Sequence, residues 1–236
     1  MLAPETNGLW EGLHDAPELS SFVLIAGSAL ALHVRHRVSE DLDFVTVDPR
    51  LPRRVLDRYL GSREERWDRR DDPVAHDEFL NAGMEPHDYQ QDFIVDDAVK
   101  VTFFTADEPL GRALDGSTGA RVGPRLATLD ELFRSKAILS ASRSRTRDWL
   151  DLYTLFSVHG YSASDYQAAF VRSGIPRQWE DGLGRRCSGR VPKSDEGYLH
   201  LSDKAPSLGE MVELFRRIRD EIERRSASNL GGLEAD

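Results

Sequence analysis

The segment Phe22-Val-Leu-Ile-Ala26, followed by Gly27-Ser28 and then Ala29-Leu-Ala-Leu-His33, decides the fold of the N-terminal half. Its first part is a short continuous apolar run, which predicts a buried strand, and its last part is typical of a helix. A strand–helix junction exposes backbone N–H groups at the positive helix end, where a phosphate is stabilised. Glycine lets a phosphate approach the backbone closely, and the Ser28 hydroxyl adds a donor. A Gly-Ser pair alone mostly marks a turn.

The next segment, Asp41-Leu-Asp-Phe-Val-Thr-Val47, alternates in polarity and is rich in β-forming residues, so it predicts a second strand. Asp41 and Asp43 are two residues apart and therefore leave the same face of that strand. Two close carboxylates are costly unless a cation neutralises them, and Mg²⁺ prefers carboxylate and phosphate oxygens together. A lone Asp-x-Asp usually marks an exposed strand face. After Gly27-Ser28, it predicts a site for a magnesium nucleotide.

Further along the chain, the pattern predicts a hairpin of Phe93 to Val95 and Val99 to Phe104, with Asp96-Asp97 at its turn. Thr128 and Glu131 form a capping box at the start of a helix. Helices are predicted over Leu129 to Ala141, Asp148 to Val158, Ala163 to Ser173 and Leu208 to Arg225, and loops over Asp115 to Gly119 and Gly182 to Gly197. We therefore expect an α+β fold with a small mixed sheet and flanking helices over residues 1–124, a helical domain over 125–228 and a flexible tail over 229–236.

Composition excludes several classes of protein. The chain has 236 residues, 39% of them hydrophobic, which suits one large domain or one domain with a helical extension. No run of eighteen apolar residues predicts a membrane span, and the N-terminus lacks the features of a secretory signal. The single cysteine, Cys187, excludes an internal disulfide and fits a reducing compartment, so we expect a cytoplasmic protein.

The charge is unevenly distributed. The formal net charge of −10 argues against avid nonspecific binding of nucleic acid. Residues 68–97 hold ten acids and two arginines, a net charge of −8, whereas residues 121–147 hold seven bases and two acids, a net charge of +5. The basic stretch is either a set of solvated helix faces or a surface for a polyanion such as nucleotide phosphates or RNA.

Two separated motifs carry a family resemblance. Gly27-Ser-Ala-Leu30, His36-Arg-Val-Ser39 and Asp41-Leu-Asp-Phe44 resemble the polymerase-β-type nucleotidyltransferase superfamily, in particular the AbiEii/AbiGii toxins of abortive-infection and toxin–antitoxin systems. The second motif is a lysine followed by arginine and then Arg-Asp-x-x-Asp-Leu, found here as Lys136, Arg143, Arg147, Asp148 and Asp151. The resemblance covers about Phe22 to Phe156 and implies a polymerase-β-like core followed by a C-terminal helical bundle.

The resemblance also implies roles for residues. Lys136 would contact the nucleotide phosphates, Asp148 would hold that lysine or assist the attacking group, and Arg147 would brace a phosphate or a carboxylate. The alternative is an Arg–Asp ion-pair network that pins two helices together. If Leu129 to Phe156 formed one helix, the motif would lie along one broad face. The candidate catalytic residues are Asp41, Asp43, Lys136 and Asp148; the nucleotide-binding residues are Gly27, Ser28, Arg37, Lys136 and Arg147; the metal ligands are Asp41 and Asp43.

Two positions depart from the family pattern. Many superfamily members carry a third carboxylate on a neighbouring strand, where this chain has Thr102. Threonine cannot be a general base, so Asp43 and Asp148 are left as candidates for accepting the proton. Arg35 stands before His36, where the family usually has glycine, and this change affects the turn into the second strand.

The function implied is a Mg²⁺-dependent transfer of a nucleotidyl group from an NTP to an acceptor, with RNA (tRNA in particular) or a protein as the acceptor. The resemblance further implies a toxin with a possible cognate antitoxin. Three alternatives stay open at this point. They are a small-molecule nucleotidyltransferase acting on a cationic substrate such as an aminoglycoside, a nucleotide-binding regulatory module without turnover, and a phosphotransferase.

Overall fold

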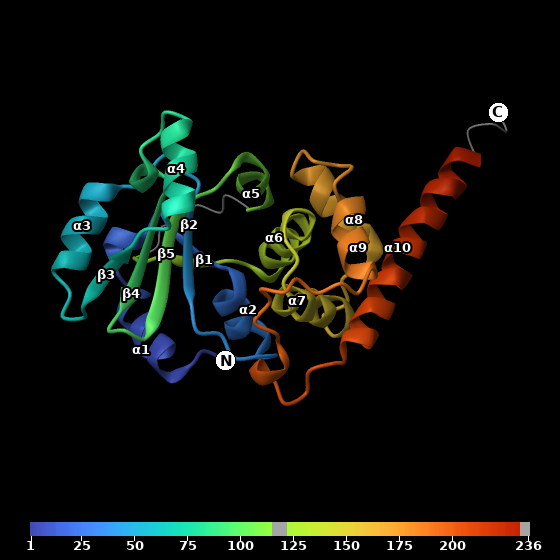
Figure 1. Cartoon of the computed structure of the whole chain (residues 1–236), viewed down its shortest axis with the longest axis horizontal. Helices are drawn as coiled ribbons and strands as arrows, with labels where there is room; N and C mark the ends of the chain where they lie inside the picture. Colours follow the sequence, from blue (N-terminus) through green and yellow to red (C-terminus); the bar gives the residue numbers. More distant parts are fainter. Residues whose placement is uncertain (115–121, 232–236) are drawn as a thin grey trace. The chain divides into compact units, whose positions relative to one another are not determined.

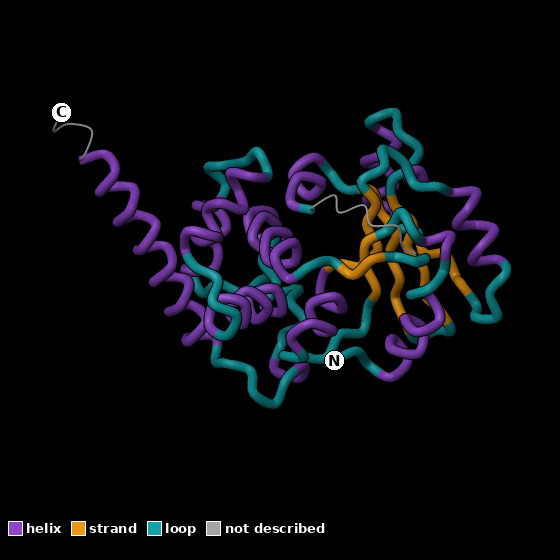
Figure 2. The backbone as a smooth tube through the Cα atoms, turned by 180° about the vertical axis from the view of Figure 1, so that it is seen from behind, coloured by secondary structure: helices purple, strands orange, loops and turns teal. Residues whose placement is uncertain are grey.

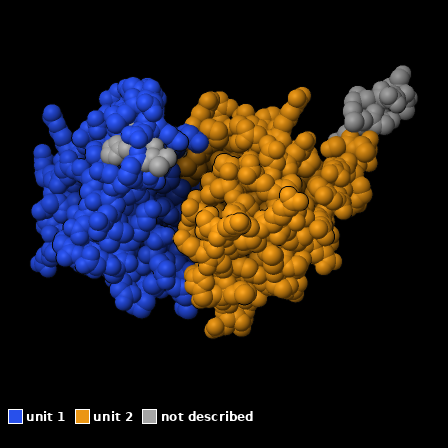
Figure 3. All heavy atoms as spheres, viewed as in Figure 1, with its two compact units in different colours: residues 1–107, 116–132 blue, residues 108–115, 133–236 orange. Residues whose placement is uncertain are grey.

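The computed structural model describes residues 1–114 and 122–231. They divide into two compact units (Figure 3). The sheet unit comprises Met1–Asp107 and Gly116–Leu132, and the helical unit comprises Glu108–Asp115 and Phe133–Asp236. The division follows Leu132, whereas the sequence placed it after residue 124. Helix α5 (Glu108–Ala113) belongs to the helical unit, where Arg172 Nε of α8 donates to the Arg112 carbonyl at 3.1 Å.

Within the described residues, six strands form one mixed sheet in the order β3-β4-β5-β2-β1-β6 (Figure 2). Strand β2 is antiparallel to β1 and parallel to β5, β4 is antiparallel to β3 and β5, and β6 is parallel to β1. The mixed α/β fold is as predicted. The strands are β1 (Val23–Ile25), β2 (Leu42–Thr46), β3 (Trp67–Arg70), β4 (Gln90–Val95), β5 (Val99–Thr105) and β6 (Arg125–Leu126).

One face of the sheet is the hydrophobic core of its unit. Leu24, Phe44 and Phe103 are fully buried there, and the Phe44 and Phe103 rings stack with their centroids 5.2 Å apart. Trp10 of α1 (Pro4–Leu13) stacks on Phe44 at 6.3 Å, so α1 covers this face. Because side chains alternate along a strand, the strand residues next to Phe44 and Phe103 in sequence point to the opposite face. That opposite face carries the polar side chains Asp43, Thr102 and Asp92.

The predicted hairpin is confirmed. Asp96 and Asp97 both have positive φ, at 50° and 57°, and the Ala98 N–H donates to the Val95 carbonyl at 2.9 Å. Two successive left-handed residues define a type I′ turn, whose twist matches that of the flanking strands. The remaining helical segments of the sheet unit are α2 (Ala26–Val34), α3 (Arg53–Gly61), α4 (Pro73–Asn81) and the 3₁₀ turns η1 (Pro17–Leu19) and η2 (Pro86–Asp88), most of them labelled in Figure 1.

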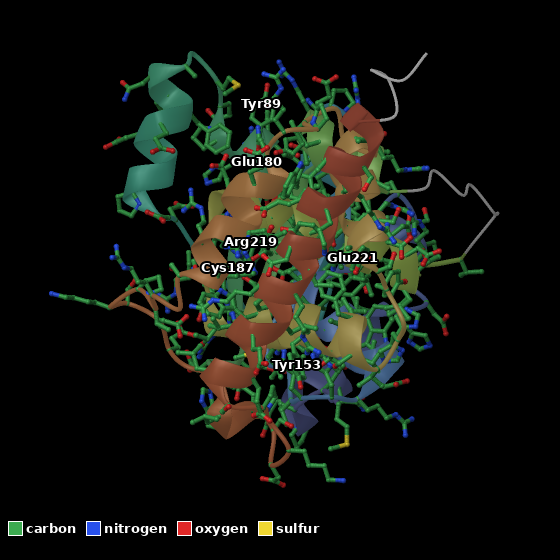
Figure 4. All side chains as sticks on the ribbon, turned by 90° about the vertical axis from the view of Figure 1, so that its right-hand side faces the viewer. Tyr89, Tyr153, Glu180, Cys187, Arg219 and Glu221 are labelled. Carbon is green, nitrogen blue, oxygen red and sulfur yellow. The ribbon has the colours of Figure 1, made fainter. Side chains whose placement is uncertain are left out.

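The helical unit contains α6 (Leu129–Ser142, which begins in the sheet unit), α7 (Thr146–Ser157), α8 (Ala163–Arg172), α9 (Trp179–Cys187), η3 (Leu199–Leu201) and α10 (Leu208–Gly231). The predicted capping box of α6 is present, with Thr128 N–H donating to Glu131 Oε2 at 2.7 Å and Glu131 N–H to Thr128 Oγ1 at 3.3 Å. Figure 4 shows α10 beside α9, and Arg216 of α10 donates to the Cys187 carbonyl at 3.2 Å. The predicted loop over Asp115 to Gly119 lies outside the described residues.

The separate helices predicted over Leu129 to Ala141 and Asp148 to Val158 are present as α6 and α7, and the extended backbone of Arg145 (φ −120°, ψ 135°) lies between them. Three other expectations for this half were wrong. The expected loop over Gly182 to Gly197 begins inside α9. Residues 125–126 form a strand beside β1 before the helix starts. Helix α10 also continues to Gly231, past the start of the expected tail. Among the described helices, none combines the length and apolar character that a membrane crossing requires.

Candidate functional site

The strand–helix junction predicted at Gly27 is present, but the helix starts earlier than expected. Strand β1 ends at Ile25 and α2 begins at Ala26, so Gly27 and Ser28 lie in the first turn of α2. Ala26 has φ 61°, a left-handed conformation that non-glycine residues seldom adopt. The N-cap residue, Ile25, provides no side-chain hydrogen bond to the helix. A Cβ on Gly27 would overlap the Arg37 guanidinium and lie 3.0 Å from Ser39 Oγ. Glycine is therefore required here by the side chains packed against it.

Ser28 and Arg37 point inward at this junction. The Ser28 side chain is 1% exposed, and its Oγ donates to the Asp41 carbonyl and lies 3.0 Å from Ser39 Oγ. Arg37 is also buried, and its Nη1 donates to the Val38 carbonyl at 3.0 Å. The Ser28 hydroxyl thus ties α2 to the start of β2, and the Arg37 guanidinium packs against Gly27. Ser39 also belongs to this cluster. The motif His36-Arg-Val-Ser39 contains it, but the sequence alone indicated no role for it.

Asp41 and Asp43 leave the same face of the β2 segment. Leu42 lies between the two aspartates and Phe44 follows them, and both are fully buried on the core face of the sheet. Asp41 and Asp43 are half-buried on the opposite face. Two carboxylates leave coordination positions for phosphate oxygens and water, which fits the way Mg²⁺ is held by one or two carboxylates plus a nucleotide. In residues 1–114 and 122–231 no group of three or more His, Cys, Asp or Glu side chains forms a metal cage. The donor set therefore matches a metal that arrives with its nucleotide.

Arg35 occupies the position where a glycine was expected from the family pattern. It is the C-terminal cap of α2 and has φ 52° and ψ 29°, the left-handed conformation that glycine favours. The turn into β2 is thus retained with an arginine in it. Its backbone carries about 1–2 kcal/mol of conformational strain that glycine would not.

Thr102 has a carboxylate partner that sequence analysis missed. Its Oγ1 donates to Asp92 Oδ1 at 2.7 Å, across the β4–β5 pair. Strand β5, which carries Thr102, lies between β4 and β2. The register pairs Thr102 with Asp92 on β4 and with Asp43 on β2. Asp92 had been counted only within the acidic stretch, because nothing in a single sequence gives strand register.

The second motif forms a buried charge cluster in the helical unit. The Lys136 ammonium lies 2.7 Å from Asp148 Oδ1 and 2.6 Å from Asp151 Oδ2, and Lys136 and Asp148 are 3% and 2% exposed. Arg143 adds two contacts to Asp148, at 2.9 Å and 3.2 Å. The ion-pair network between α6 and α7 is therefore present. The lysine is held by its aspartates, as the resemblance implied for Asp148.

The electrostatics of Asp148 decide what it can do. Burial alone would raise the pKa of this carboxyl, but the Lys136 ammonium and then the Arg143 guanidinium outweigh burial and hold the pKa well below its ordinary value. A carboxylate with so low a pKa remains ionised and is a weak base. Asp148 is thus better suited to anchoring Lys136 than to accepting a proton.

Beside this cluster lies a cavity of about 300 Å³. Three arginines line it at alternate positions, Arg143, Arg145 and Arg147, together with the segment from Pro192 to Gly197. Asp195 on that segment is engaged with the start of α7, accepting from the Thr146 N–H at 2.9 Å and from Thr146 Oγ1 at 2.5 Å. Glu196 is 77% exposed and lies 3.7 Å from Arg147. The wall of the cavity therefore carries three arginines and two carboxylates, an excess of one positive charge.

Comparison with known proteins places these features in a family. A model of the AbiEii family, described as "Nucleotidyl transferase AbiEii toxin, Type IV TA system", matches residues 9–225. The chain belongs to the AbiEii nucleotidyltransferase toxin family. It is thus a nucleotidyltransferase, and its type IV toxin–antitoxin family implies a nucleotide substrate and a cognate antitoxin.

Two solved structures share the fold of this AbiEii protein. JHP933 from Helicobacter pylori has 19% sequence identity and a TM-score of 0.50, over 99% of this chain and 100% of that one. A second H. pylori protein, described as a candidate nucleotidyltransferase, has 18% identity and a TM-score of 0.50, over 93% of this chain and 96% of that one. No curated protein matches the AbiEii chain at a significant level.

The candidate residues of this AbiEii protein fall into two sets. Contacts bring Gly27, Ser28, Arg37 and Asp41 together in the sheet unit, with Asp43 on the same strand face. Lys136, Asp148 and the cavity-lining Arg147 belong to the helical unit. The acidic stretch of residues 68–97 is largely engaged by cations in the sheet unit: Arg66 pairs with Asp68, Arg50 and Arg53 with Asp88, His87 with Asp71 and Lys100 with Asp92.

Proposed function

We propose that this toxin transfers an NMP group from a Mg²⁺-bound NTP to a hydroxyl group of an RNA, such as tRNA. The observation that carries the proposal is the polar face of β2. There Asp41 and Asp43 project together, next to the N-terminus of α2, whose N-cap residue Ile25 provides no side-chain hydrogen bond. Carboxylates beside a helix N-terminus suit a ligand that combines a divalent cation with phosphate groups.

Each residue of the sheet unit has a proposed task. Asp41 and Asp43 hold Mg²⁺, which when bound neutralises the triphosphate and lowers the barrier to attack on the α-phosphorus. The backbone N–H groups after Gly27 receive phosphate oxygens. Ser28 and Arg37 act from beneath, since the buried Ser28 side chain fixes α2 to the start of β2 and the buried Arg37 side chain packs against Gly27. This work is mostly positioning and charge neutralisation, as in other phosphoryl transfers.

The helical unit contributes cations. Lys136 is buried with its ammonium 2.7 Å from Asp148 and 2.6 Å from Asp151, so its task is to brace the segment that carries Arg143, Arg145 and Arg147. Arg147 lines the cationic cavity and braces a phosphate there. Guanidinium groups bind phosphates in a bidentate manner, which favours phosphate groups over neutral ligands in such a cavity.

The choice of RNA over a small cationic acceptor follows from the charges. A cationic acceptor such as an aminoglycoside would need unengaged carboxylates, and four aspartates of the acidic stretch already have arginine or lysine partners within 3.5 Å. The nearby cavity lined by Asp71, Asp72 and His87 measures about 30 Å³, far smaller than an aminoglycoside. A polyanionic acceptor instead suits the three arginines at residues 143–147.

The test is a mass measurement of the acceptor. The protein is incubated with each NTP, Mg²⁺ and one of three acceptors: total tRNA, an aminoglycoside, or no addition, so that the protein itself is the acceptor. The expected product is RNA heavier by one NMP, with release of pyrophosphate. A gain of phosphate alone, a labelled aminoglycoside, or NTP binding without any product would each overturn the proposal.

Two variants assign the product to this site. Asp41→Asn and Asp43→Asn should each reduce product formation at least about 100-fold, because each removes one negative ligand from the metal. Asp48→Asn is the matched control, since Asp48 is exposed and follows the same strand. Equal activity of the three variants would exclude β2 as the metal site.

A further inference from the structure

One row of the sheet carries three polar side chains in register. Asp43 of β2 is paired with Thr102 of β5, and Thr102 is paired with Asp92 of β4. Side chains paired across neighbouring strands point to the same face, and adjacent strands lie about 4.8 Å apart. Thr102 therefore stands between the proposed metal ligand Asp43 and the carboxylate of Asp92, on the face opposite the Phe44–Phe103 core.

The hydrogen-bond direction between Thr102 and Asp92 is fixed. A threonine hydroxyl has one hydrogen, and Thr102 Oγ1 donates it to Asp92 Oδ1 at 2.7 Å. The lone pairs of Oγ1 are left to accept a hydrogen bond from another group. A hydroxyl that gives its hydrogen to a carboxylate is a better acceptor, because hydrogen bonds in a chain polarise one another.

The Asp92 carboxylate is itself held in place. Gln90 Nε2 donates to Oδ2 at 2.6 Å, and the Lys100 ammonium lies 3.5 Å from Oδ1. Asp92 also lines a cavity of about 30 Å³ with Arg70, Asp71, Asp72 and His87, which is enough room for a water molecule. These are the charged and titratable groups that face Asp92 from the elements around it, and the water provides an exit for a proton.

Other candidates for the proton acceptor are less suitable. Asp148 is engaged by Lys136 and Arg143 and has a depressed pKa. Asp43 is the proposed metal ligand, and a carboxylate that binds a cation is a weaker base. The Lys100 ammonium lies 3.5 Å from Asp92, farther than the cations that hold Asp148, and the partner of Asp92, Thr102, is the residue beside Asp43.

We infer that Asp92 is a positioning residue that makes Thr102 a proton relay for the attacking hydroxyl. This inference rests on the proposed function. The acceptor O–H bond breaks as its oxygen bonds to the α-phosphorus. The released proton passes to Thr102 Oγ1, and the hydrogen of Thr102 passes to Asp92 Oδ1. The bond from the α-phosphorus to its bridging oxygen breaks, and its electron pair leaves with pyrophosphate. Asp92 returns the proton to water.

The carboxylate that superfamily members carry on this strand is thus supplied from the next strand, through Thr102. The relay predicts that the two residues act as a unit. Asp92→Asn keeps an oxygen that accepts the Thr102 hydrogen bond but removes the proton acceptor. Thr102→Val removes the hydroxyl with little change in shape. Each variant should lower kcat about 100-fold with KM for the NTP unchanged, and the double variant should be no worse than either single variant.

The pH profile and a rescue variant separate the relay from a structural role. The acid limb of the pH profile of kcat should differ between the wild type and Asp92→Asn. Asp92→Asn combined with Thr102→Asp places a carboxylate directly on β5 and should recover at least about tenfold of the lost rate. Gln90→Ala removes one hydrogen bond to Asp92 but leaves the carboxylate, so its loss of kcat should be smaller than that of Asp92→Asn. Asp48→Asn, at an exposed carboxylate of the same unit outside the relay, is the matched control and should retain kcat within about threefold.

The outcomes distinguish the two proposals. If the wild-type protein forms no product that carries an NMP group, both the proposed function and the relay are excluded. An active wild type whose Asp92→Asn variant keeps its kcat and its pH profile overturns the relay alone. Equal losses in Asp92→Asn and Gln90→Ala, with equal drops in Tm and no rescue by Thr102→Asp, assign the network to stability and also overturn it.

Discussion

Lys136 and Asp148 form a buried ion pair, with Nζ 2.7 Å from Oδ1, and Asp151 approaches the same ammonium at 2.6 Å. The pair joins α6 to α7 across a break in the helix. Removing a charge from water costs free energy, and the attraction between two buried opposite charges offsets that cost. Loss of one partner therefore leaves an uncompensated buried charge. The residues proposed to serve the reaction therefore also hold the helical unit together.

Lys136→Met should lower the free energy of unfolding by about 3–5 kcal/mol, because it leaves Asp148 and Asp151 buried without their shared cation. Urea denaturation followed by circular dichroism measures the change. Glu221→Ala is the control, since its pair with Arg225 is exposed on α10 and should contribute less than about 1 kcal/mol. Wild-type stability in Lys136→Met would show that the ion cluster does not hold α6 to α7.

Asp148 should make the stability depend on pH at the acid end. Its pKa in the folded protein lies below the ordinary value of 3.8, so the unfolded state binds its proton first. The stabilisation is complete above about pH 4 and is lost as pH falls below that value towards the folded pKa, at up to about 1.4 kcal/mol per pH unit. Urea denaturation between pH 2 and 6 should show a flatter curve for Asp148→Asn. Parallel curves would contradict this origin.

Arg35→Gly should stabilise the protein by about 1 kcal/mol, because glycine adopts the left-handed conformation at this cap without strain. Arg54→Gly is the control, for which the opposite change in stability is expected. Arg54 lies exposed within α3, where glycine costs about 1 kcal/mol relative to good helix formers. Thermal unfolding should show a higher Tm for Arg35→Gly and a lower Tm for Arg54→Gly. A lower Tm for Arg35→Gly would show that the contacts of the Arg35 side chain matter more than its backbone strain.

Gly27→Ala should disturb the junction, because the new Cβ meets the Arg37 guanidinium. A loss of about 1–3 kcal/mol of stability is expected from such overpacking, together with weaker NTP binding in calorimetry. The double variant Gly27→Ala/Arg37→Ala should recover part of the stability, since it removes the clashing group. Gly61→Ala controls for the extra methyl, because a Cβ there meets no atom within 4 Å. A fully stable Gly27→Ala would contradict the close packing.

Arg145→Ala should weaken RNA binding and make it less sensitive to salt. Each lost phosphate contact reduces the slope of log K against log salt by about 0.7–0.9. Arg145 lines the cationic cavity and is exposed, so the substitution should leave Tm unchanged. Arg177→Ala is the control, an exposed arginine of the same unit that does not line the cavity. Identical slopes for the two variants would exclude the cavity as an RNA contact.

Local patterns were enough to predict the elements that carry the motifs. The strand before Gly27, the β2 alternation, the hairpin and the α6 capping box all depend on neighbours within a few residues. The helix containing Gly182 and Gly184 was missed because glycine normally disfavours helices. A Cβ at Gly182 would overlap Ser140 Oγ and the Tyr166 hydroxyl, so tertiary packing selects glycine there against its local preference.

The contacts within the candidate site were less predictable. The break between α6 and α7 includes a contact from far along the chain, because Asp195 accepts a hydrogen bond from the Thr146 N–H, 49 positions away. The partner of Thr102 follows from the register of β4 against β5, and an error of one residue in that register would turn Asp92 to the other face. The paired spacing of Asp41 and Asp43, by contrast, needs only the two-residue repeat of a strand.

Cys187 has a practical consequence for spectroscopy. It is the chain's one cysteine, it is buried on α9, and burial raises the pKa of its thiol, so little reactive thiolate is present at neutral pH. Thiol-directed spin labels or fluorophores should therefore leave the native protein almost unmodified. Cysteines introduced at exposed positions such as Ser142 or Glu108 can then be labelled selectively without first replacing the native residue.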